Sequence, residues 1–554
     1  MNIIPQTGVT GGDALVETLC AHGVDTAFTV SGESFLYVLD AMRRRPDRIR
    51  LLATRHEGGA AFAAEAFGKI AGRPAAVLVS RGPGASNAAI GVHTARQDCT
   101  PMLLFIGQVR TRSRGREAFQ EIDHRRMFAS LAKAVLEPRD AASIADVTAE
   151  AVALSMAGRP GPVVVALPRD LTEARLEQLA APDRRLRPGR MPDPAAMAKA
   201  AEMIGKARRP LIVAGELVAQ QAASAALAAF AEATGAPVMA AYRRQDVMDN
   251  RHPAYAGHLE INRMPFQREA FAAADLIVAV GSRLDGITTE DGTLIRPDQE
   301  SIQIYPDAAV LARSGCTLPI FGDVAPTLAE LTSPTPPTSA DRVALRDELH
   351  AAFLDFSSPD SFSASGAVDL AKALADLQSV QPADTVIVTD GGSFARWVHR
   401  FYRFTAPHSQ AGPMSGAMGY AVPGAIGATL ARPGATAVAF VGDGGFMMSG
   451  QEMVTAVEHG LPIKVIVCDN GAHGSILAGQ IGAFGVDADY GTVLASPDFA
   501  AVARAYGAAA WRIERTDEFL PALREALEYD GPALLHLITD RRDIAPFGAG
   551  KDAV

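Results

Sequence analysis

The sequence has few cysteines, no excess of basic residues and no apolar run long enough to cross a bilayer. Its net charge of −10 argues against nucleic acid or an anionic membrane as the main partner. The first residues are polar and lead directly into a helical pattern, which is not the pattern of a signal peptide. Scattered cysteines without metal-ligand spacing are typical of reduced thiols, so a cytoplasmic location is expected. These cysteines are Cys20, Cys99, Cys316 and Cys468.

The rest of the composition is that of a globular protein with a large core. Hydrophobic residues make up 48% of the 554 positions and charged residues 21%, and this length leaves room for three domains. Apolar runs alternate with helical patterns from end to end. We therefore expect an α/β fold of three domains, each a parallel sheet flanked by helices. Proline-rich stretches at 181–194 and 333–338 resemble linkers and place the domains at 1–180, 190–335 and 360–554.

Short apolar runs mark the expected strands of each domain, and two amphipathic stretches at 13–22 and 58–69 predict helices in the first. The expected strands are 26–30, 75–79, 102–106 and 163–167 in the first domain, 211–214, 276–280 and 301–304 in the second, and 385–388, 436–440, 463–468 and 533–538 in the third.

Two loops of the third domain predict a metal site. Asp443 lies in the glycine-rich turn 441–446 after one expected strand, and Asn470 follows the next strand. In a parallel sheet such loops open side by side at the carboxyl edge, where ligands of α/β folds bind. Gly442, Gly444 and Gly445 would let backbone N–H groups approach an anion. Carboxylate and amide oxygens suit Mg²⁺, although a plain strand-to-helix turn would explain Gly-Asp-Gly on its own.

A second pair of loops lies in the first domain. Glu57 opens the helix that we expect at 58–69, and a glycine-rich loop is expected at 80–87 after a strand. Both loops fall at the carboxyl edge of that sheet. An acidic residue in a first helical turn also has an ordinary explanation, because it interacts favourably with the helix dipole.

These motifs resemble those of a known enzyme family. The Asp443 and Asn470 loops are similar to the diphosphate-binding segment of thiamine diphosphate (ThDP) enzymes. The His-Glu-Gly at 56–58, the Gly-Pro-Gly at 82–84 and the segment 118–123 resemble the pyrimidine-binding domain of the acetolactate synthase branch. The resemblance implies a pyrimidine-binding first domain, a central domain, a diphosphate-binding third domain, and ThDP and Mg²⁺ as cofactors.

The resemblance also implies roles for single residues. The Glu57 carboxyl would bind the aminopyrimidine ring nitrogen of the cofactor and share a proton with it. Met418 would support the bent cofactor, although a core methionine is the alternative, and the Gly416 carbonyl would accept from the amino group. The Ala472 carbonyl would be the third metal ligand. The other implied cofactor-binding residues are Gly32, Ser80, Pro83, Asn87, Gly391, Ser393, Phe394, Gly442, Gly444, Gly445, Gly474 and Ser475.

Other implied residues concern the substrate. Phe119 and Gln120 would lie beside it, and His93 and Gln97 are further candidates. His473 stands where relatives carry a large apolar side chain, so it is either a catalytic residue or a solvated loop histidine. The central domain matches only in outline, and residues 242–246 and 255–258 lack the pattern expected for FAD, which is therefore not expected.

The activity implied by the resemblance is decarboxylation of a 2-oxo acid with carboligation, on a small-molecule 2-oxo acid or acyl donor. The alternatives are a simple 2-oxo acid decarboxylase and a ThDP-dependent lyase acting on an acyl-CoA or hydroxyketone. A nucleotide-binding module and a catalytically silent relative represent other classes. Because Glu57 and the metal loops lie in different domains, the resemblance implies a homo-oligomer, a dimer or a dimer of dimers.

Overall fold

The computed structural model describes residues 8–178, 189–333, 338–485 and 489–546. Within them the chain forms two compact units. The first unit contains residues 8–178, 422–433 and 449–461, and the second contains the remaining described residues. The two predicted linkers fall partly on residues outside these ranges, at 181–188 and 334–337. No helix in the described ranges combines the length and the apolar character that crossing a bilayer requires.

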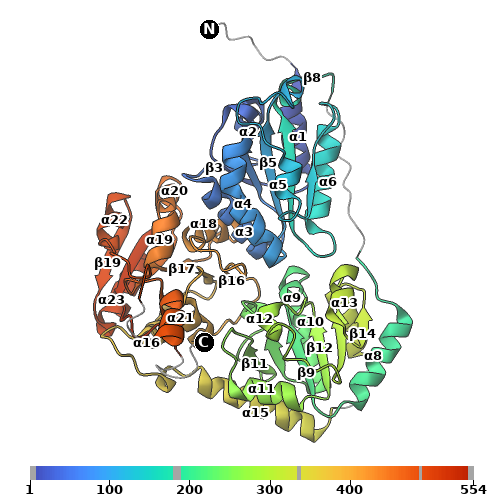
Figure 1. Ribbon diagram of the computed structural model, residues 1–554, viewed down its shortest axis with the longest axis vertical. Coiled ribbons are helices and arrows are strands. Elements are labelled where there is room, and N and C mark those ends of the chain that lie inside the picture. Colours follow the sequence, from blue (N-terminus) through green and yellow to red (C-terminus); the bar gives the residue numbers. More distant parts are fainter. Residues whose placement is uncertain (1–7, 179–188, 334–337, 486–488, 547–554) are drawn as a thin grey trace. The chain divides into compact units, whose positions relative to one another are not determined.

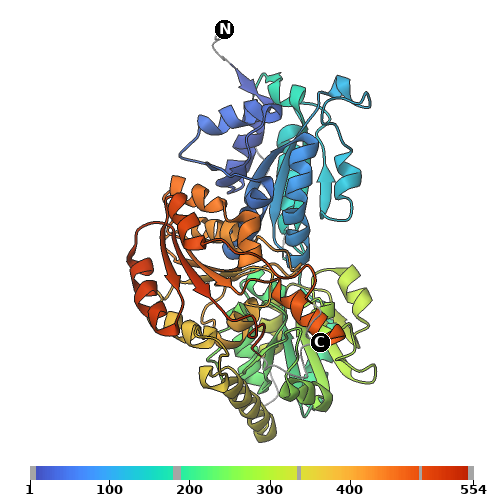
Figure 2. The same ribbon diagram turned by 60° about the vertical axis from the view of Figure 1, so that its left-hand side comes forward.

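The first unit is built around a six-stranded parallel sheet with the strand order β3-β2-β4-β5-β7-β6. Figures 1 and 2 show this sheet, in blue and cyan, between layers of helices. Its centre is apolar on both faces, as expected for parallel strands covered by helices. The strands are β2 (Thr26–Thr29), β3 (Arg50–Ala53), β4 (Ala76–Ser80), β5 (Met102–Gln108), β6 (Ala134–Leu136) and β7 (Pro162–Pro168).

Two pairs of helices cover this sheet. Helices α1 (Gly11–Ala21) and α6 (Ile144–Met156) share one hydrophobic core with the strands, whereas α3 (Glu57–Ala71) and α4 (Arg81–Asp98) pack against each other. Helix α1 begins where it does because of a capping box, in which the Thr10 hydroxyl oxygen accepts from the Asp13 N–H and the Asp13 carboxylate accepts from the Thr10 N–H.

The second unit contains two further six-stranded parallel sheets. The central-domain sheet has the order β11-β10-β9-β12-β13-β14. Helices α11 (Pro265–Ala273) and α15 (Ala340–Phe356) contribute Phe271 and Leu349 to its core. Its strands are β9 (Pro210–Ala214), β10 (Val238–Ala240), β11 (Tyr255–His258), β12 (Leu276–Val280), β13 (Glu300–Ile304) and β14 (Leu318–Ile320).

The C-terminal sheet has the order β16-β15-β17-β18-β20-β19. The register pairs Thr389 with Phe440 and Gly442 with Cys468, so the carboxyl ends of β15, β17 and β18 reach the same edge. The strands are β15 (Val386–Thr389), β16 (Gln410–Ala411), β17 (Ala437–Gly442), β18 (Lys464–Asp469), β19 (Ala509–Ile513) and β20 (Ala533–Ile538). The expected α/β class with three parallel sheets is confirmed.

Several sequence expectations about elements were wrong. Strands β3, β6, β10, β11, β14, β16 and β19 were missed because each has only 2 to 5 residues and lacks a long apolar run. The expected loop at 80–87 is the first part of α4, because the early Pro83 needs no intrahelical N–H partner. The expected glycine-rich turn at 441–446 is partly helical, because helix α19 (Asp443–Ser449) begins at Asp443, directly after β17.

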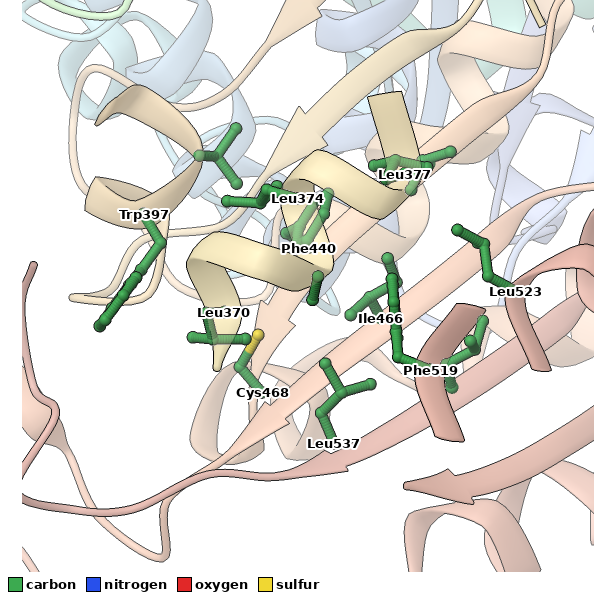
Figure 3. Packing of buried hydrophobic residues seen from close by; sticks show 14 of the residues in the cluster. Leu370, Leu374, Leu377, Trp397, Phe440, Ile466, Cys468, Phe519, Leu523 and Leu537 are labelled. Carbon is green, nitrogen blue, oxygen red and sulfur yellow. The ribbon is translucent and has the colours of Figure 1, made fainter. Parts of the chain in front are cut away.

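One hydrophobic core supports the edge at which β15, β17 and β18 end. Helix α16 (Leu370–Val380) places Leu370, Leu374 and Leu377 on one face, at the spacing of successive helical turns. Figure 3 shows these leucines packed against Phe440 and Ile466 of the central strands. Because this core lies under the strands that carry the third-domain loops, its packing fixes their positions.

We expect Leu374→Ala to destabilise the C-terminal domain by about 2–5 kcal/mol, because Leu374 is 1% exposed and truncation leaves a cavity. Both tryptophans, Trp397 and Trp511, belong to this domain, so intrinsic fluorescence during urea unfolding measures its stability. The control is Leu36→Ala, since Leu36 is 50% exposed. Equal urea midpoints for the two variants would contradict the expectation.

Candidate active site

A cavity of about 480 Å³ opens at the carboxyl edge of the C-terminal sheet. It lies where the segments after β15, β17 and β18 emerge, so three neighbouring strands of one sheet present their loops to it. All third-domain residues singled out from the sequence line it: Gly391, Ser393, Phe394, Gly416, Met418, Gly442, Asp443, Gly444, Gly445, Asn470, Ala472, His473, Gly474 and Ser475. We call this cavity the diphosphate cleft after the ligand proposed below.

Glycines allow the walls of the diphosphate cleft to approach one another. A Cβ atom on Gly391 would lie 2.4 Å from the Gly416 carbonyl oxygen, and one on Gly474 would lie 2.7 Å from Ser393 Oγ. A larger residue at Gly391 would therefore clash with backbone, and one at Gly474 would require the Ser393 hydroxyl to move. Gly416 also has a φ of 70°, a backbone conformation that favours glycine. Close packing of these segments leaves backbone groups at the surface of the cleft.

His473 and Met418 both line the diphosphate cleft. A Cβ atom on Gly444 would lie 2.9 Å from His473 Cε1, so the imidazole packs directly on the glycine turn that follows β17. The structure therefore places His473 within the cleft lining. Met418 is half-buried in the same lining, which fits a side chain that contacts a ligand as well as the protein.

Glu57 begins helix α3 in the first unit, after β3. The His56 side chain caps this helix, because its Nδ1 accepts from the Gly58 N–H at 3.0 Å. Asn87, on α4, donates from Nδ2 to Glu57 Oε2 at 2.9 Å. The two N-terminal motifs thus meet through a direct hydrogen bond, and the second carboxylate oxygen of Glu57 is left for another partner.

The other candidates of the first unit differ in their packing and exposure. A Cβ atom on Gly32 would lie 2.6 Å from Ser80 Cβ, so these two residues pack tightly. The Gln120 carbonyl accepts from the Gly82 N–H at 3.0 Å, which joins the segment 118–123 to the start of α4. Pro83, Asn87 and Gln120 are exposed, and so is Phe119 at 75%. His93 and Gln97 lie on α4 and are half-buried.

Three segments of the chain match the domains of one enzyme family. Residues 9–127 match the thiamine pyrophosphate enzyme N-terminal TPP binding domain, residues 197–331 its central domain, and residues 390–537 its C-terminal TPP binding domain. Thiamine pyrophosphate (TPP) is the same compound as ThDP. The chain belongs to the thiamine pyrophosphate enzyme family. It is therefore a ThDP-dependent enzyme, and the resemblance described from its motifs is confirmed.

Curated relatives of this ThDP enzyme are similar along nearly its whole length. The Escherichia coli acetolactate synthase isozyme 2 large subunit is 31% identical over 558 residues, which cover 98% of each chain. The Methanocaldococcus jannaschii probable acetolactate synthase large subunit is 30% identical over 551 residues, covering 97% of this chain and 93% of the relative. The Corynebacterium glutamicum acetolactate synthase large subunit is 30% identical over 562 residues, covering 98% and 87%.

Two acidic groups, Asp443 after β17 and Asp469 at the end of β18, indicate how the ThDP enzyme could hold a cation. Asp443 is 3% exposed, and burial followed by the charge of Asp469 raises the pKa of its carboxyl. Ser496 Oγ lies 2.8 Å from Asp469 Oδ1 and 3.3 Å from Asp443 Oδ2. The Ser496 hydroxyl has one hydrogen and can donate it to only one of these carboxylates. A metal ion beside the buried Asp443 carboxylate would therefore stabilise its charged form. Asn470 adds an amide oxygen, as Mg²⁺ prefers.

Asp390 is a residue of the cleft framework that the sequence analysis missed. It is fully buried and accepts from the backbone N–H groups of Gly391 at 2.7 Å, Gly419 at 2.9 Å and Ala421 at 2.9 Å. Burial raises its pKa to about 6, although these N–H groups favour the charged form. Asp390 therefore ties the segment after β15 to the segment that carries Gly416 and Met418. The sequence does contain a signal for Asp390, because this residue lies at a strand end directly before two glycines.

Glu452 plays a similar part in the first unit and was also missed. Helix α20 (Glu452–Glu458) buries its carboxylate, which accepts from the Arg55 and His56 N–H groups, each at 3.0 Å. A Cβ atom on Gly59 would lie 2.6 Å from Glu452 Oε1, which shows how closely α20 approaches the start of α3. Glu452 thus fixes the turn that presents Glu57. Nearly 400 residues separate the partners, so sequence spacing gave no signal.

Proposed function

We propose that this ThDP enzyme uses Mg²⁺, decarboxylates a small 2-oxo acid and joins the remaining acyl unit to an acceptor carbonyl, in the manner of an acetolactate synthase. One observation carries the proposal. Asp443, Asn470 and Ala472 line a single cleft together with the glycine segments after β15 and β17. Similarity to acetolactate synthase large subunits along nearly the whole chain supports the choice of reaction.

Within the diphosphate cleft we assign the metal to the Asp443 carboxylate, the Asn470 amide oxygen and the Ala472 carbonyl oxygen. The diphosphate would be bound by backbone N–H groups and by Ser393 and Ser475. Its glycine contacts would be Gly391, Gly442, Gly444, Gly445 and Gly474. We assign Met418 and Phe394 to apolar contacts with the cofactor, and the Gly416 carbonyl to its amino group. When bound, ThDP supplies a carbon nucleophile and an electron sink for the loss of CO₂.

Glu57 is proposed to exchange a proton with the aminopyrimidine ring nitrogen of the cofactor. Asn87 binds one oxygen of the Glu57 carboxylate and so orients the other. Gly32, Ser80 and Pro83 are proposed to shape the same pyrimidine site. Phe119 and Gln120 are proposed to contact substrate, and their exposure leaves them available. The domain boundaries at 1–180, 190–335 and 360–554 remain part of this proposal.

We further propose that the site is shared between subunits of a homo-oligomer, a dimer or a dimer of dimers. Large apolar side chains are exposed at both halves of the site. Phe119 is 75% exposed beside the Glu57 half, and Ile476 and Met448 are 61% and 53% exposed in the lining of the diphosphate cleft. Exposed apolar side chains that gather at a functional site are typical of surfaces that contact another protein or a ligand, and a second subunit is the proposed cover.

Mixing two inactive variants tests the shared site. Glu57→Gln and Asp443→Asn each disable one half, so a mixed dimer keeps one complete site only if the halves come from different chains. Random assortment makes about half of the dimers mixed, which predicts recovery of about a quarter of wild-type activity after co-expression. Size-exclusion chromatography checks that the variants assemble. No recovery in correctly assembled mixed dimers would place both halves in one chain.

His473 favours one alternative to carboligation, in which the enzyme is a simple 2-oxo acid decarboxylase. Its imidazole lies in the cleft lining beside Gly444, where relatives are expected to carry an apolar side chain. A group able to donate a proton there would favour release of an aldehyde, as in a simple 2-oxo acid decarboxylase. Mass spectrometry distinguishes the outcomes, because carboligation gives a coupled hydroxyketone or hydroxy-oxoacid.

A panel of 2-oxo acids and acyl-CoA esters, with and without added ThDP and Mg²⁺, tests the proposed function. We expect CO₂ release from 2-oxo acids that requires both additions. Turnover of acyl-CoA esters alone would favour the lyase alternative. FAD is not part of the proposal, so the purified enzyme should need no flavin for activity. None of the described cysteines forms a disulfide, which supports a cytoplasmic location.

A further inference from the structure

Part of the lining of the diphosphate cleft is not used by the proposed cofactor contacts. The central domain supplies Tyr242, Arg243 and Glu260 to it, and helix α17 (Ala395–Phe401) supplies Arg396 and Trp397. We call these five residues the second wall of the cleft. Tyr242, Arg243 and Glu260 come from outside the three segments that carry the glycines and the metal-site residues, whereas Arg396 and Trp397 follow directly on Gly391, Ser393 and Phe394.

Arg396 is the unusual member of this wall. It is half-buried and lines the cleft, yet its guanidinium forms no hydrogen bond or ion pair with any residue that the structure describes. A guanidinium presents five N–H donors that match the oxygens of carboxylate and phosphate groups. Such a group in a ligand cavity is therefore available to an anionic ligand.

Neighbouring acids do not neutralise Arg396. Glu260 accepts from the Ile261 N–H at 2.9 Å and shares a 2.6 Å hydrogen bond with His399 Nδ1. Asp543, also in the lining, accepts from the Ser365 and Gly366 N–H groups. Both carboxylates already have partners, and neither forms an ion pair with Arg396 in the described part of the chain.

Arg243 adds a second positive charge to the same wall. It is 5% exposed and is fixed by hydrogen bonds from Nε to Tyr242 Oη at 3.1 Å and from Nη2 to the Asp390 carbonyl at 3.1 Å. Burial raises the pKa of Tyr242, and the charges of Arg243 and Arg396 act against that shift, as expected where both lie near its hydroxyl. Tyr242 is therefore a neutral hydrogen-bonding group beside two cations.

We propose that Arg396 binds an anionic group of the substrate, a carboxylate, sulfonate or phosphate other than the carboxylate that leaves as CO₂. The proposal rests on the proposed function, since it names the substrate class of that enzyme: a small 2-oxo acid with a second anionic group. In the cavity of about 480 Å³, Arg396 lies on the part of the lining that the proposed cofactor contacts leave for a second ligand. The cofactor diphosphate is the competing anion, but the glycine segments and the metal site already account for its binding.

Matched pairs of substrates test this assignment on the enzyme loaded with ThDP and Mg²⁺. One pair is 2-oxoglutarate and 2-oxopentanoate, and a second is sulfopyruvate and 2-oxobutyrate, with phosphonopyruvate as a phosphorus analogue. We expect the wild type to have the higher kcat/KM for the charged member of at least one pair. Arg396→Gln should lower that value about 10- to 100-fold and leave the uncharged member unchanged. Arg396→Lys should keep part of the preference.

The matched control is Arg524→Gln, because Arg524 is exposed on α23 (Thr516–Glu528), outside the cleft lining. It should behave as the wild type with every substrate. A wild type that prefers the uncharged member of every pair, or an Arg396→Gln variant that keeps the charged preference, would overturn the assignment.

A second measurement separates substrate from cofactor. Trp397 is next to Arg396 and lines the cleft, so in a Trp511→Phe background its fluorescence reports ThDP binding in the presence of Mg²⁺. We expect equal ThDP affinity with and without Arg396→Gln. Weaker ThDP binding combined with an unchanged substrate preference would assign Arg396 to the diphosphate and overturn the proposal. A wild type that binds no ThDP would instead refute the proposed function, and this assignment with it.

Discussion

Replacing Asp443 by Asn should lower the apparent affinity for Mg²⁺ by at least about 100-fold, since even residues that only orient a metal ligand cost 10–100-fold when lost. The substitution keeps the shape of the side chain and removes the one formal negative charge among the proposed ligands. Turnover at low Mg²⁺ should fall in proportion, and high Mg²⁺ should restore part of it. Isothermal titration of Mg²⁺ in the presence of ThDP measures the change.

Thermal unfolding distinguishes this loss of binding from a folding defect. Asp443 is buried near Asp469, and burial raises its pKa, so its charged form costs stability when no cation is bound. The neutral amide removes that cost. Without ligands, Asp443→Asn should therefore unfold at or above the wild-type temperature.

With Mg²⁺ and ThDP bound, the wild type should unfold at a higher temperature than Asp443→Asn. At a cofactor concentration 100-fold above its Kd, binding stabilises the wild type by about 2.7 kcal/mol, and the variant should gain almost none of this. The control is Asp517→Asn, because Asp517 is exposed and forms an ion pair with its neighbour Arg515. An Asp443→Asn protein with wild-type stabilisation by Mg²⁺ and ThDP would remove Asp443 from the metal site.

The elements that the sequence predicted well share one physical property. Strand β12 is a continuous apolar run, and β18 has one at 465–468, because parallel strands are covered on both faces. The loops after them follow from topology, so Asp443 and Asn470 could be placed at one sheet edge before the structure was known. Short strands such as β16, with 2 residues, carry no such pattern.

The residues that the sequence could not reveal are those whose role depends on distant partners. Glu452 binds the turn at Arg55 and His56, which lies nearly 400 residues earlier in the chain. Ser496 joins Asp443 to Asp469, although no local motif marks it. Asp390 is recognisable only because three backbone N–H groups converge on it, and two of them come from residues about 30 positions away. Tertiary contacts created these roles, so spacing alone could not indicate them.

Replacing Glu57 by Gln should lower kcat by about 10²- to 10⁴-fold, the usual contribution of a positioned acid–base group. Glutamine has nearly the same size, and its amide oxygen can still accept from Asn87 Nδ2, so the local packing should remain. An amide cannot exchange a proton with a ring nitrogen as a carboxyl can. The loss should therefore appear in kcat, with little change in ThDP affinity.

Two measurements separate this chemical role from a structural one. The melting temperature should stay near that of the wild type, because the helix cap from His56 and the Glu452 contacts do not involve the Glu57 carboxyl. Hydrogen–deuterium exchange at the reactive carbon of added ThDP, followed by NMR, should slow together with kcat. The control is Glu177→Gln, since Glu177 is exposed beyond β8 (Arg175–Leu176). Wild-type turnover and exchange in Glu57→Gln would show that another group handles the proton, and the significance of the Glu57–Asn87 contact would then be structural.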